Sequence, residues 1–127
     1  MRLRVRLWLV IAALNGALAV AFGAFAAHGL SQKMDAHALG IFETGARYHM
    51  YHALAMGLAA LAMPGKAVRT ATWSAALFLA GIILFSGSLY ALALTGEREF
   101  AFVTPVGGVS FLAGWVTLAL AAWRSKA

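Results

Sequence analysis

Four long runs of apolar residues, separated by short polar segments, dominate the chain. The runs cover residues 7–27, 46–63, 71–94 and 103–123. Each has roughly the 20 residues that a helix needs to cross about 30 Å of hydrocarbon. None shows the strict alternation of a barrel strand, and in lipid only helices and closed barrels satisfy the backbone polar groups. The pattern therefore predicts four transmembrane helices.

Composition supports a membrane protein. Of the 127 residues, 63% are hydrophobic and only 11% are charged, whereas soluble domains have about 45–50% and 25%, respectively. No linker or shift in composition divides the chain, so we expect one domain over residues 1–127. Cysteine is absent, which excludes disulfides, iron–sulfur clusters and a cysteine nucleophile.

The charged residues predict the orientation of the helices. The net charge is +6, but the basic residues form no stripe beside aromatic residues, which argues against nucleic acid as a partner. One side of the predicted membrane holds Arg2, Arg4, Arg6, Lys66, Arg69, Arg124 and Lys126; the other holds Lys33, Arg47 and Arg98 with all the acids, Asp35, Glu43, Glu97 and Glu99. By the positive-inside rule both termini face the cytoplasm.

The first apolar run also resembles a secretory signal. A basic start precedes it, and Ala24-Phe25-Ala26 matches a small-x-small cleavage pattern. The run is longer than the apolar region of a signal peptide, so we expect a retained first helix.

Local signals mark the ends of other helices. Ser31 can cap a short amphipathic helix between the first two spans, lying along the outer interface. Its apolar face would be Met34, Ala38, Ile41 and Phe42. Alternatively, these residues are a straight extension of the second span. At the start of the fourth span, Thr104 offers a capping hydroxyl and Pro105 occupies the first helical position.

Small residues predict how the helices pack. Two seams have a mean spacing of 3.5 residues: Ala12, Gly16, Ala19, Gly23 and Ala26 in the first span, and Gly107, Ser110, Gly114, Thr117 and Ala121 in the fourth. Such seams let membrane helices approach closely. We therefore predict an all-α, integral membrane four-helix bundle.

Polar side chains within the spans are costly in hydrocarbon and are candidates for function. They are Asn15 near the middle of the first span and, in the outer half, His28, Glu43, Arg47, Tyr48, His49, His52, Ser86, Ser88 and Thr104. Glu43 and Arg47 can form an ion pair, or Arg47 can hold a lipid phosphate or an acidic ligand.

Tyr48, His49 and His52 lie on a separate face of the second span. Each histidine can be neutral and hydrogen-bonded to a neighbouring helix. Alternatively, they could form a metal or haem site with His28 or His37, or take part in proton transfer or quinone contact. No phosphate-binding loop, zinc-protease spacing or serine elbow occurs. We therefore expect no enzymatic activity, no metal and no cofactor.

Four stretches carry a resemblance to a known family. They are Gly-Ala-Phe-Ala-Ala-His-Gly-Leu at 23–30, Phe-Glu-Thr-Gly-Ala-Arg-Tyr-His-Met-Tyr-His-Ala-Leu-Ala at 42–55, Leu-Phe-Ser-Gly-Ser-Leu-Tyr at 84–90 and Thr-Pro-Val-Gly-Gly at 104–108. Together they resemble the YgdD-like family of small bacterial inner-membrane proteins, a domain of unknown function; Ala26 departs from its usual glycine. The resemblance implies four transmembrane helices in the cytoplasmic membrane and no particular reaction.

The leading hypothesis is a non-enzymatic lipid-binding or accessory protein of the bacterial inner membrane. Its site would be a cluster in the outer leaflet centred on Arg47, His49 and His52. We expect membrane lipids as partners. Through the same surface the chain could also join a homo-oligomer or a larger membrane complex. The alternatives are an oligomeric transporter of protons or a small solute, and an accessory subunit carrying haem, a quinone or a metal.

Overall fold

A computed structural model describes residues 1–125, and within that range the regular structure is helical. The five α-helices are α1 (Leu3–His28), α2 (Ala36–Leu61), α3 (Val68–Gly81), α4 (Gly87–Thr95) and α5 (Thr104–Arg124). Two short 3-10 helices, η1 (Leu30–Gln32) and η3 (Arg98–Phe102), lie in the connections. A π-helical segment, η2 (Ile82–Ser86), joins α3 to α4 without a break.

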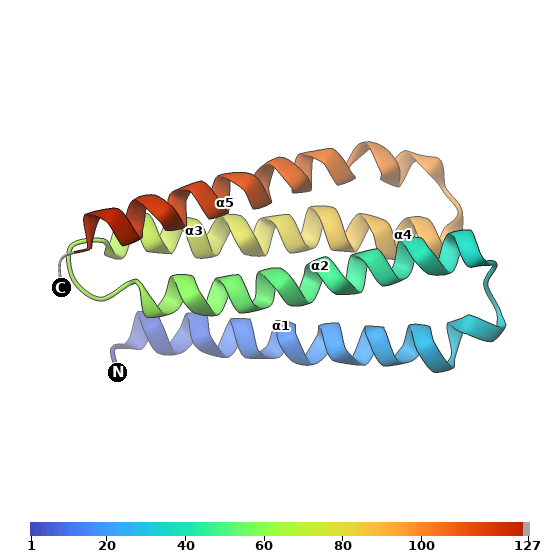
Figure 1. Ribbon diagram of the computed structural model, residues 1–127, viewed down its shortest axis with the longest axis horizontal. Helices are drawn as coiled ribbons and strands as arrows, with labels where there is room; N and C mark the ends of the chain where they lie inside the picture. Colours follow the sequence, from blue (N-terminus) through green and yellow to red (C-terminus); the bar gives the residue numbers. More distant parts are fainter. Residues whose placement is uncertain (126–127) are drawn as a thin grey trace.

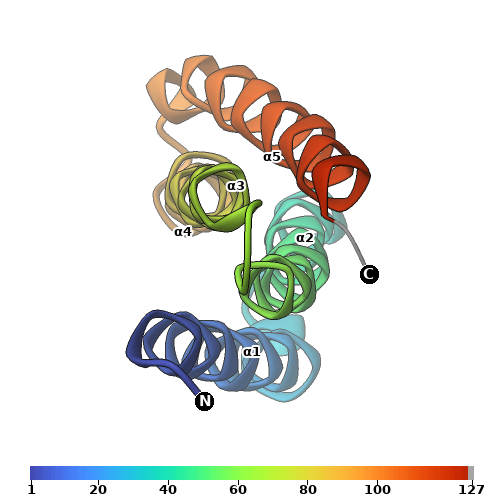
Figure 2. The same cartoon turned by 90° about the vertical axis from the view of Figure 1, so that its left-hand side faces the viewer.

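Four long rods run side by side, because α3, η2 and α4 form a single rod (Figure 1). Both chain ends and the α2–α3 connection lie at one end of the molecule, and the other two connections lie at the opposite end (Figure 1). The α2 helix is central: it packs against α1 on one side and against α3, η2 and α4 on the other. The α5 helix packs mainly against α3 and η2, on the far side from α1 (Figure 2).

Three rods are long and apolar enough to cross a membrane, namely Leu3–Gln32, Val68–Thr95 and Arg98–Arg124. They correspond to the first, third and fourth predicted spans. The α2 helix does not meet that standard of composition. Arg47, His49 and His52 lower its hydropathy over the part that the second predicted span occupies.

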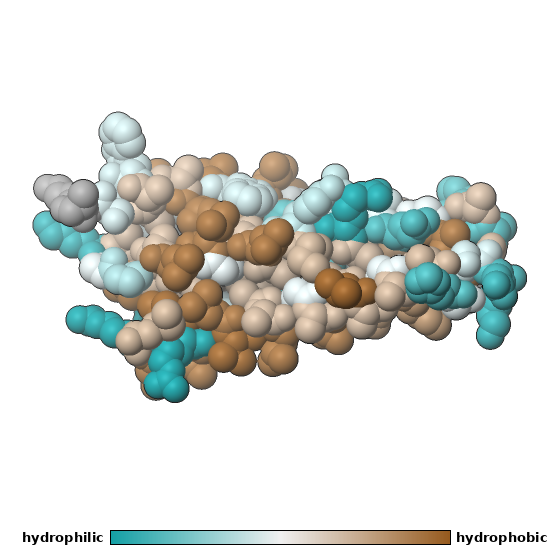
Figure 3. All heavy atoms as spheres, turned by 60° about the horizontal axis from the view of Figure 1, so that its bottom comes forward, coloured by the Kyte–Doolittle hydropathy of each residue, from teal (hydrophilic) through white to brown (hydrophobic). Residues whose placement is uncertain are grey.

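The surface is largely apolar where those rods are exposed. On α1 and α5, large exposed side chains include Leu7, Val10, Leu14, Leu18, Val106, Val109, Leu112, Val116 and Leu120. On the face drawn in Figure 3, apolar side chains cover much of the middle and hydrophilic side chains stand at both ends. An apolar girdle between polar ends is the surface that a protein needs when hydrocarbon surrounds it.

The small-residue seams are interfaces, as predicted, but they face different neighbours. On α1 the buried seam residues are Ala12, Ala19 and Ala26, which pack towards α2. On α5, Gly107 and Gly114 are buried against the α3–η2 rod. Because α1 and α5 lie on opposite sides of the molecule, neither seam meets the other.

The predicted helix starting at Ser31 is wrong. The α2 helix begins at Ala36, where the carboxylate of Asp35 accepts the N–H of Ala38 at 2.8 Å. The Ser31 hydroxyl instead donates to the carbonyl of Ala27 at 2.9 Å. The alternative, a straight extension of the second span, is confirmed. Its apolar face carries Phe42, which is buried against the ends of α1 and α4 rather than exposed to an interface.

Candidate functional site

His49 lies at the centre of a hydrogen-bonded chain that crosses three helices. Its Nε2 is 2.9 Å from Asn15 Oδ1 on α1, and its Nδ1 is 2.9 Å from the hydroxyl of Tyr90 on α4. The Asn15 amide nitrogen donates to the carbonyl of Ile11 at 2.9 Å, so Asn15 Oδ1 is the acceptor that faces His49. His49 therefore donates from Nε2, and as a neutral imidazole it accepts the proton of the Tyr90 hydroxyl at Nδ1.

His52, one turn away, carries the opposite tautomer. Its Nδ1 is 2.7 Å from the carbonyl of Tyr48, which can only accept, and the indole N–H of Trp115 donates to Nε2 at 3.1 Å. The ring stacks on Phe111 with centroids 3.5 Å apart and an interplanar angle of 5°. His52 is thus a second neutral imidazole, and it fastens α2 to α5.

The third polar contact joins α4 to α5, beside the end of η2. The Ser88 hydroxyl lies 2.8 Å from the carbonyl of Phe85 and 2.6 Å from the hydroxyl of Thr104. Ser88 can donate to the carbonyl while it accepts from Thr104. The predicted role of Thr104 as a side-chain cap is wrong, because its hydroxyl serves this contact and no side chain caps α5. Pro105 lies in the first turn of α5, as its second residue and not in the predicted first position.

Ser86, at the end of η2, differs from these groups. It is fully buried, and its hydroxyl has no hydrogen-bond partner among the residues that the structure describes.

The exposed candidates stand apart from both histidines. Arg47 donates to the Thr44 hydroxyl at 3.3 Å, and the predicted ion pair with Glu43 is not formed. Arg47 and Glu43 are both exposed on α2, and His28 is exposed at the end of α1. The structure therefore divides the predicted cluster into buried cross-links and exposed polar groups.

Sequence reasoning missed two aromatic partners of His52, Phe111 and Trp115. Trp115 did carry a signal, because it lies in the middle of a span, whereas Trp8, Trp73 and Trp123 lie near helix ends. Tryptophan in membrane proteins usually lies at the interfaces. A tryptophan at mid-depth needs a hydrogen-bond acceptor for its N–H, and His52 provides it.

An aromatic hollow opens beside His52 on the outer surface, between α2 and α5. Its volume is about 370 Å³. The lining includes Tyr48, Tyr51, His52, Phe85, Phe111 and Trp115. We call it the aromatic groove. Within residues 1–125, no three His, Asp or Glu side chains are grouped so that they could bind a metal ion.

Comparison with known proteins identifies relatives over nearly the whole chain. Residues 22–108 match the family described as "Protein of unknown function (DUF423)". The "UPF0382 inner membrane protein YgdD" of Escherichia coli (strain K12) is 48% identical over 121 residues, which are 95% of this chain and 92% of the relative. A "UPF0382 membrane protein" of Haemophilus influenzae is 45% identical over 94% of this chain and 95% of its own.

A more distant relative is the "UPF0382 membrane protein YwdK" of Bacillus subtilis. It is 42% identical over 92% of this chain and 96% of its own length. No solved structure matches the chain.

Proposed function

This chain belongs to the DUF423 family of membrane proteins, and from that premise we propose that it is a four-span inner-membrane protein that binds a lipid in the aromatic groove. The inner membrane is the location printed for the Escherichia coli relative. Both termini would face the cytoplasm, because the end of the molecule with the termini carries Arg2, Arg4, Arg6, Lys66, Arg69 and Arg124.

The course of the chain supports a membrane crossing by α2, in addition to the three apolar rods. The α1 rod ends at one end of the molecule and α3 begins at the other (Figure 1). If both rods cross the membrane, α2 must carry the chain back between them. At about 1.5 Å per residue its 26 residues span about 39 Å, which is sufficient. Its two histidines face protein rather than lipid, with every ring nitrogen hydrogen-bonded.

The orientation can be tested because the chain has no cysteine of its own. A single cysteine at Thr95→Cys should react with a membrane-impermeant maleimide added to intact spheroplasts. A cysteine at Ser125→Cys should react only after the membrane is permeabilised. The reverse pattern, or labelling of both from one side, would contradict the proposed topology.

The aromatic groove is the observation that carries the proposal of lipid binding. It is open, lies on a surface that hydrocarbon would cover, and has a volume within the range of about 300–1,000 Å³ that small-molecule sites occupy. Arg47 lies one helical turn from Tyr51 on the exposed side of α2. The groove would hold part of an acyl chain, and Arg47 would hold the phosphate of the same lipid.

The groove can be filled without disturbing the helices around it. A Cβ at Gly108, which lines the groove, would meet the Phe85 ring at an ordinary 3.8 Å. We expect Gly108→Leu to reduce the phospholipid that co-purifies with the full chain, measured by native mass spectrometry. Arg47→Gln should weaken binding about fivefold, since one cation near a phosphate contributes about 1 kcal/mol.

The matched control is Gly40→Leu on α2, where nothing lies within 4 Å of the new Cβ. This variant should keep the wild-type complement of lipid. Equal lipid loss in both leucine variants, or none in either, would contradict the proposal. Co-purification of a quinone in place of a phospholipid would do so as well.

The two alternative functions have weaker support. To bind haem or a metal, His49 or His52 would first have to give up a hydrogen bond to Asn15, Tyr90, Tyr48 or Trp115. A proton transporter would need a path beyond the chain from Tyr90 to Asn15. That chain ends at the carbonyl of Ile11, which carries no proton onward.

A further inference from the structure

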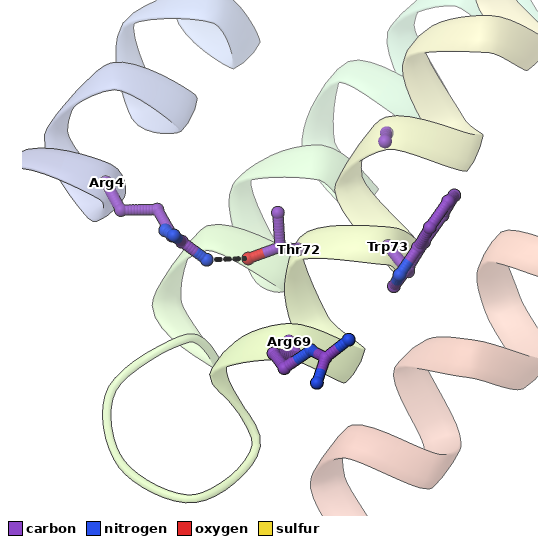
Figure 4. A pocket seen from close by; sticks show the side chains of 5 residues that line it. Arg4, Arg69, Thr72 and Trp73 are labelled. Atoms are coloured by element: carbon purple, nitrogen blue, oxygen red, sulfur yellow. Dashed lines mark hydrogen bonds between the residues drawn. The ribbon is translucent and has the colours of Figure 1, made fainter.

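Several cations lie around the first turns of α3, at the end of the molecule that holds both termini. We call this region, with Arg4, Lys66, Arg69 and Arg124, the basic end. Arg4 reaches across from α1 and donates to the Thr72 hydroxyl at 3.2 Å. From the other side, Arg124 of α5 donates to the Thr70 hydroxyl at 3.4 Å. Arg69 belongs to the same turns of α3, next to Thr72 (Figure 4). Three helices thus bring arginines to one short stretch of helix.

Two hollows flank this stretch, and they share Arg69 and Trp73. The smaller, of about 280 Å³, is lined by Arg4, Arg69, Thr72, Trp73 and Ala76. The larger, of about 610 Å³, includes Lys66, Arg69, Thr70, Trp73 and Arg124 in its lining. Each hollow therefore combines at least two cations, a threonine hydroxyl and one side of an indole ring. No acidic side chain lines either.

The local potential is positive for two further reasons. No side chain caps the beginning of α3, so no capping group offsets the positive end of its helix dipole. The four acids, at Asp35, Glu43, Glu97 and Glu99, all belong to the opposite end, near the α1–α2 and α4–α5 connections. Among residues 1–125, these cations therefore have no ionic partner.

We infer that this basic end binds the headgroup of an anionic phospholipid of the adjoining leaflet. Guanidinium groups with hydroxyls recognise phosphodiester oxygens, and Trp73 supplies an apolar wall typical of the membrane interface. Topology alone requires several cations on one side, but it does not require that they meet around two hollows. Because a second phosphate could occupy the hollow on the other side of Arg69, the lipid that fits best is cardiolipin, which has two phosphates.

The test is a lipid titration of the full chain by native mass spectrometry. Wild-type protein should bind cardiolipin more tightly than phosphatidylglycerol, and phosphatidylglycerol more tightly than phosphatidylcholine. The double variant Arg4→Gln, Arg69→Gln should bind cardiolipin about 30-fold more weakly, because each cation near an anionic headgroup contributes about a fivefold factor. The charge-matched control Lys33→Gln, Arg98→Gln, at the opposite end, should bind as wild type does.

Two further arms separate this inference from its alternatives. Arg4→Lys, Arg69→Lys keeps both charges and should retain most of the affinity even if the glutamine pair folds poorly. Inorganic phosphate at millimolar concentration should not displace the lipid. Equal weakening in both glutamine pairs, a wild-type affinity that does not fall as salt is raised, or displacement by free phosphate would overturn the inference. Arg47→Gln and Gly108→Leu should leave this binding unchanged, so the two lipid sites can fail independently.

Discussion

Two adjacent glycines at the start of α5 should respond in opposite ways to the same substitution. A Cβ built at Gly107 would lie 2.7 Å from Phe85 Cβ and 2.8 Å from the carbonyl carbon of Leu84, and closer still to the backbone nitrogen of Phe85. At Gly108 its nearest neighbour is the Phe85 ring, at 3.8 Å. The obstacle at Gly107 is largely backbone of η2, which cannot rotate away. Gly107→Ala must therefore push α5 off the α3–η2 rod.

The size of the effect follows from three contributions. Overpacking of this kind costs about 1–3 kcal/mol. Separation of the two helices also stretches the 2.6 Å contact between Ser88 and Thr104, and one interhelical hydrogen bond in a membrane contributes about 0.6 kcal/mol. Alanine regains about 1 kcal/mol of helix propensity relative to glycine. We expect Gly107→Ala to lower the free energy of unfolding by about 0.6–2.6 kcal/mol, and Gly108→Ala to raise it by up to about 1 kcal/mol.

Equilibrium unfolding in bicelles, followed by circular dichroism, can measure both variants against wild type. The gap between them, about 0.6–3.6 kcal/mol, corresponds to about 3-fold to 400-fold in the unfolding equilibrium constant. Ser88→Ala should destabilise wild type more than it destabilises Gly107→Ala, because that variant has already weakened the hydroxyl contact. If the two glycine variants are equally stable, the close approach of α5 to η2 is not as we describe it.

Two other substitutions test the buried chain and the start of α2. Tyr90→Phe should cost about 0.6–1.7 kcal/mol, because His49 Nδ1 loses its donor; Tyr51→Phe, at an exposed tyrosine, should be neutral by the same unfolding assay. Asp35→Ala should cost about 1 kcal/mol and increase amide exchange in the first turn of α2, since it removes the cap. The exchange of that turn in Ser31→Ala should stay at the wild-type rate, and equal fraying in both would contradict the assigned cap.

Length and hydropathy were sufficient to locate most of the fold, because the thickness of hydrocarbon fixes how long an apolar helix must be. The third predicted span, residues 71–94, lies within the rod Val68–Thr95. The π-helical form of η2 was not predictable, since Ile82–Ser86 reads as ordinary apolar helix. The apolar face ending at Phe42 was ambiguous for a similar reason: periodicity shows that one face is buried, but it does not show whether lipid or another helix buries it.

The sequence identified the polar residues but did not show which of them pair. His49 meets Asn15, 34 residues earlier, and Tyr90, 41 residues later. Such contacts depend on how each helix is rotated about its axis and on its height relative to its neighbours. A shift of one residue in either helix turns the side chain by about 100° and removes the contact.

The least apolar long helix, α2, is the one that has protein on both sides. This placement has a physical reason. A polar side chain is costly in hydrocarbon unless its donors and acceptors are paired. On α2 the histidines pair with groups from α1, α4 and α5, while the outer rods offer lipid mainly aliphatic residues. The cost of placing His49 and His52 in the membrane is therefore offset by hydrogen bonds inside the protein. Within residues 1–125, Arg47 on the exposed side of α2 and Arg4 and Arg69 at the basic end form no ion pair, and these are the groups left to meet a lipid phosphate.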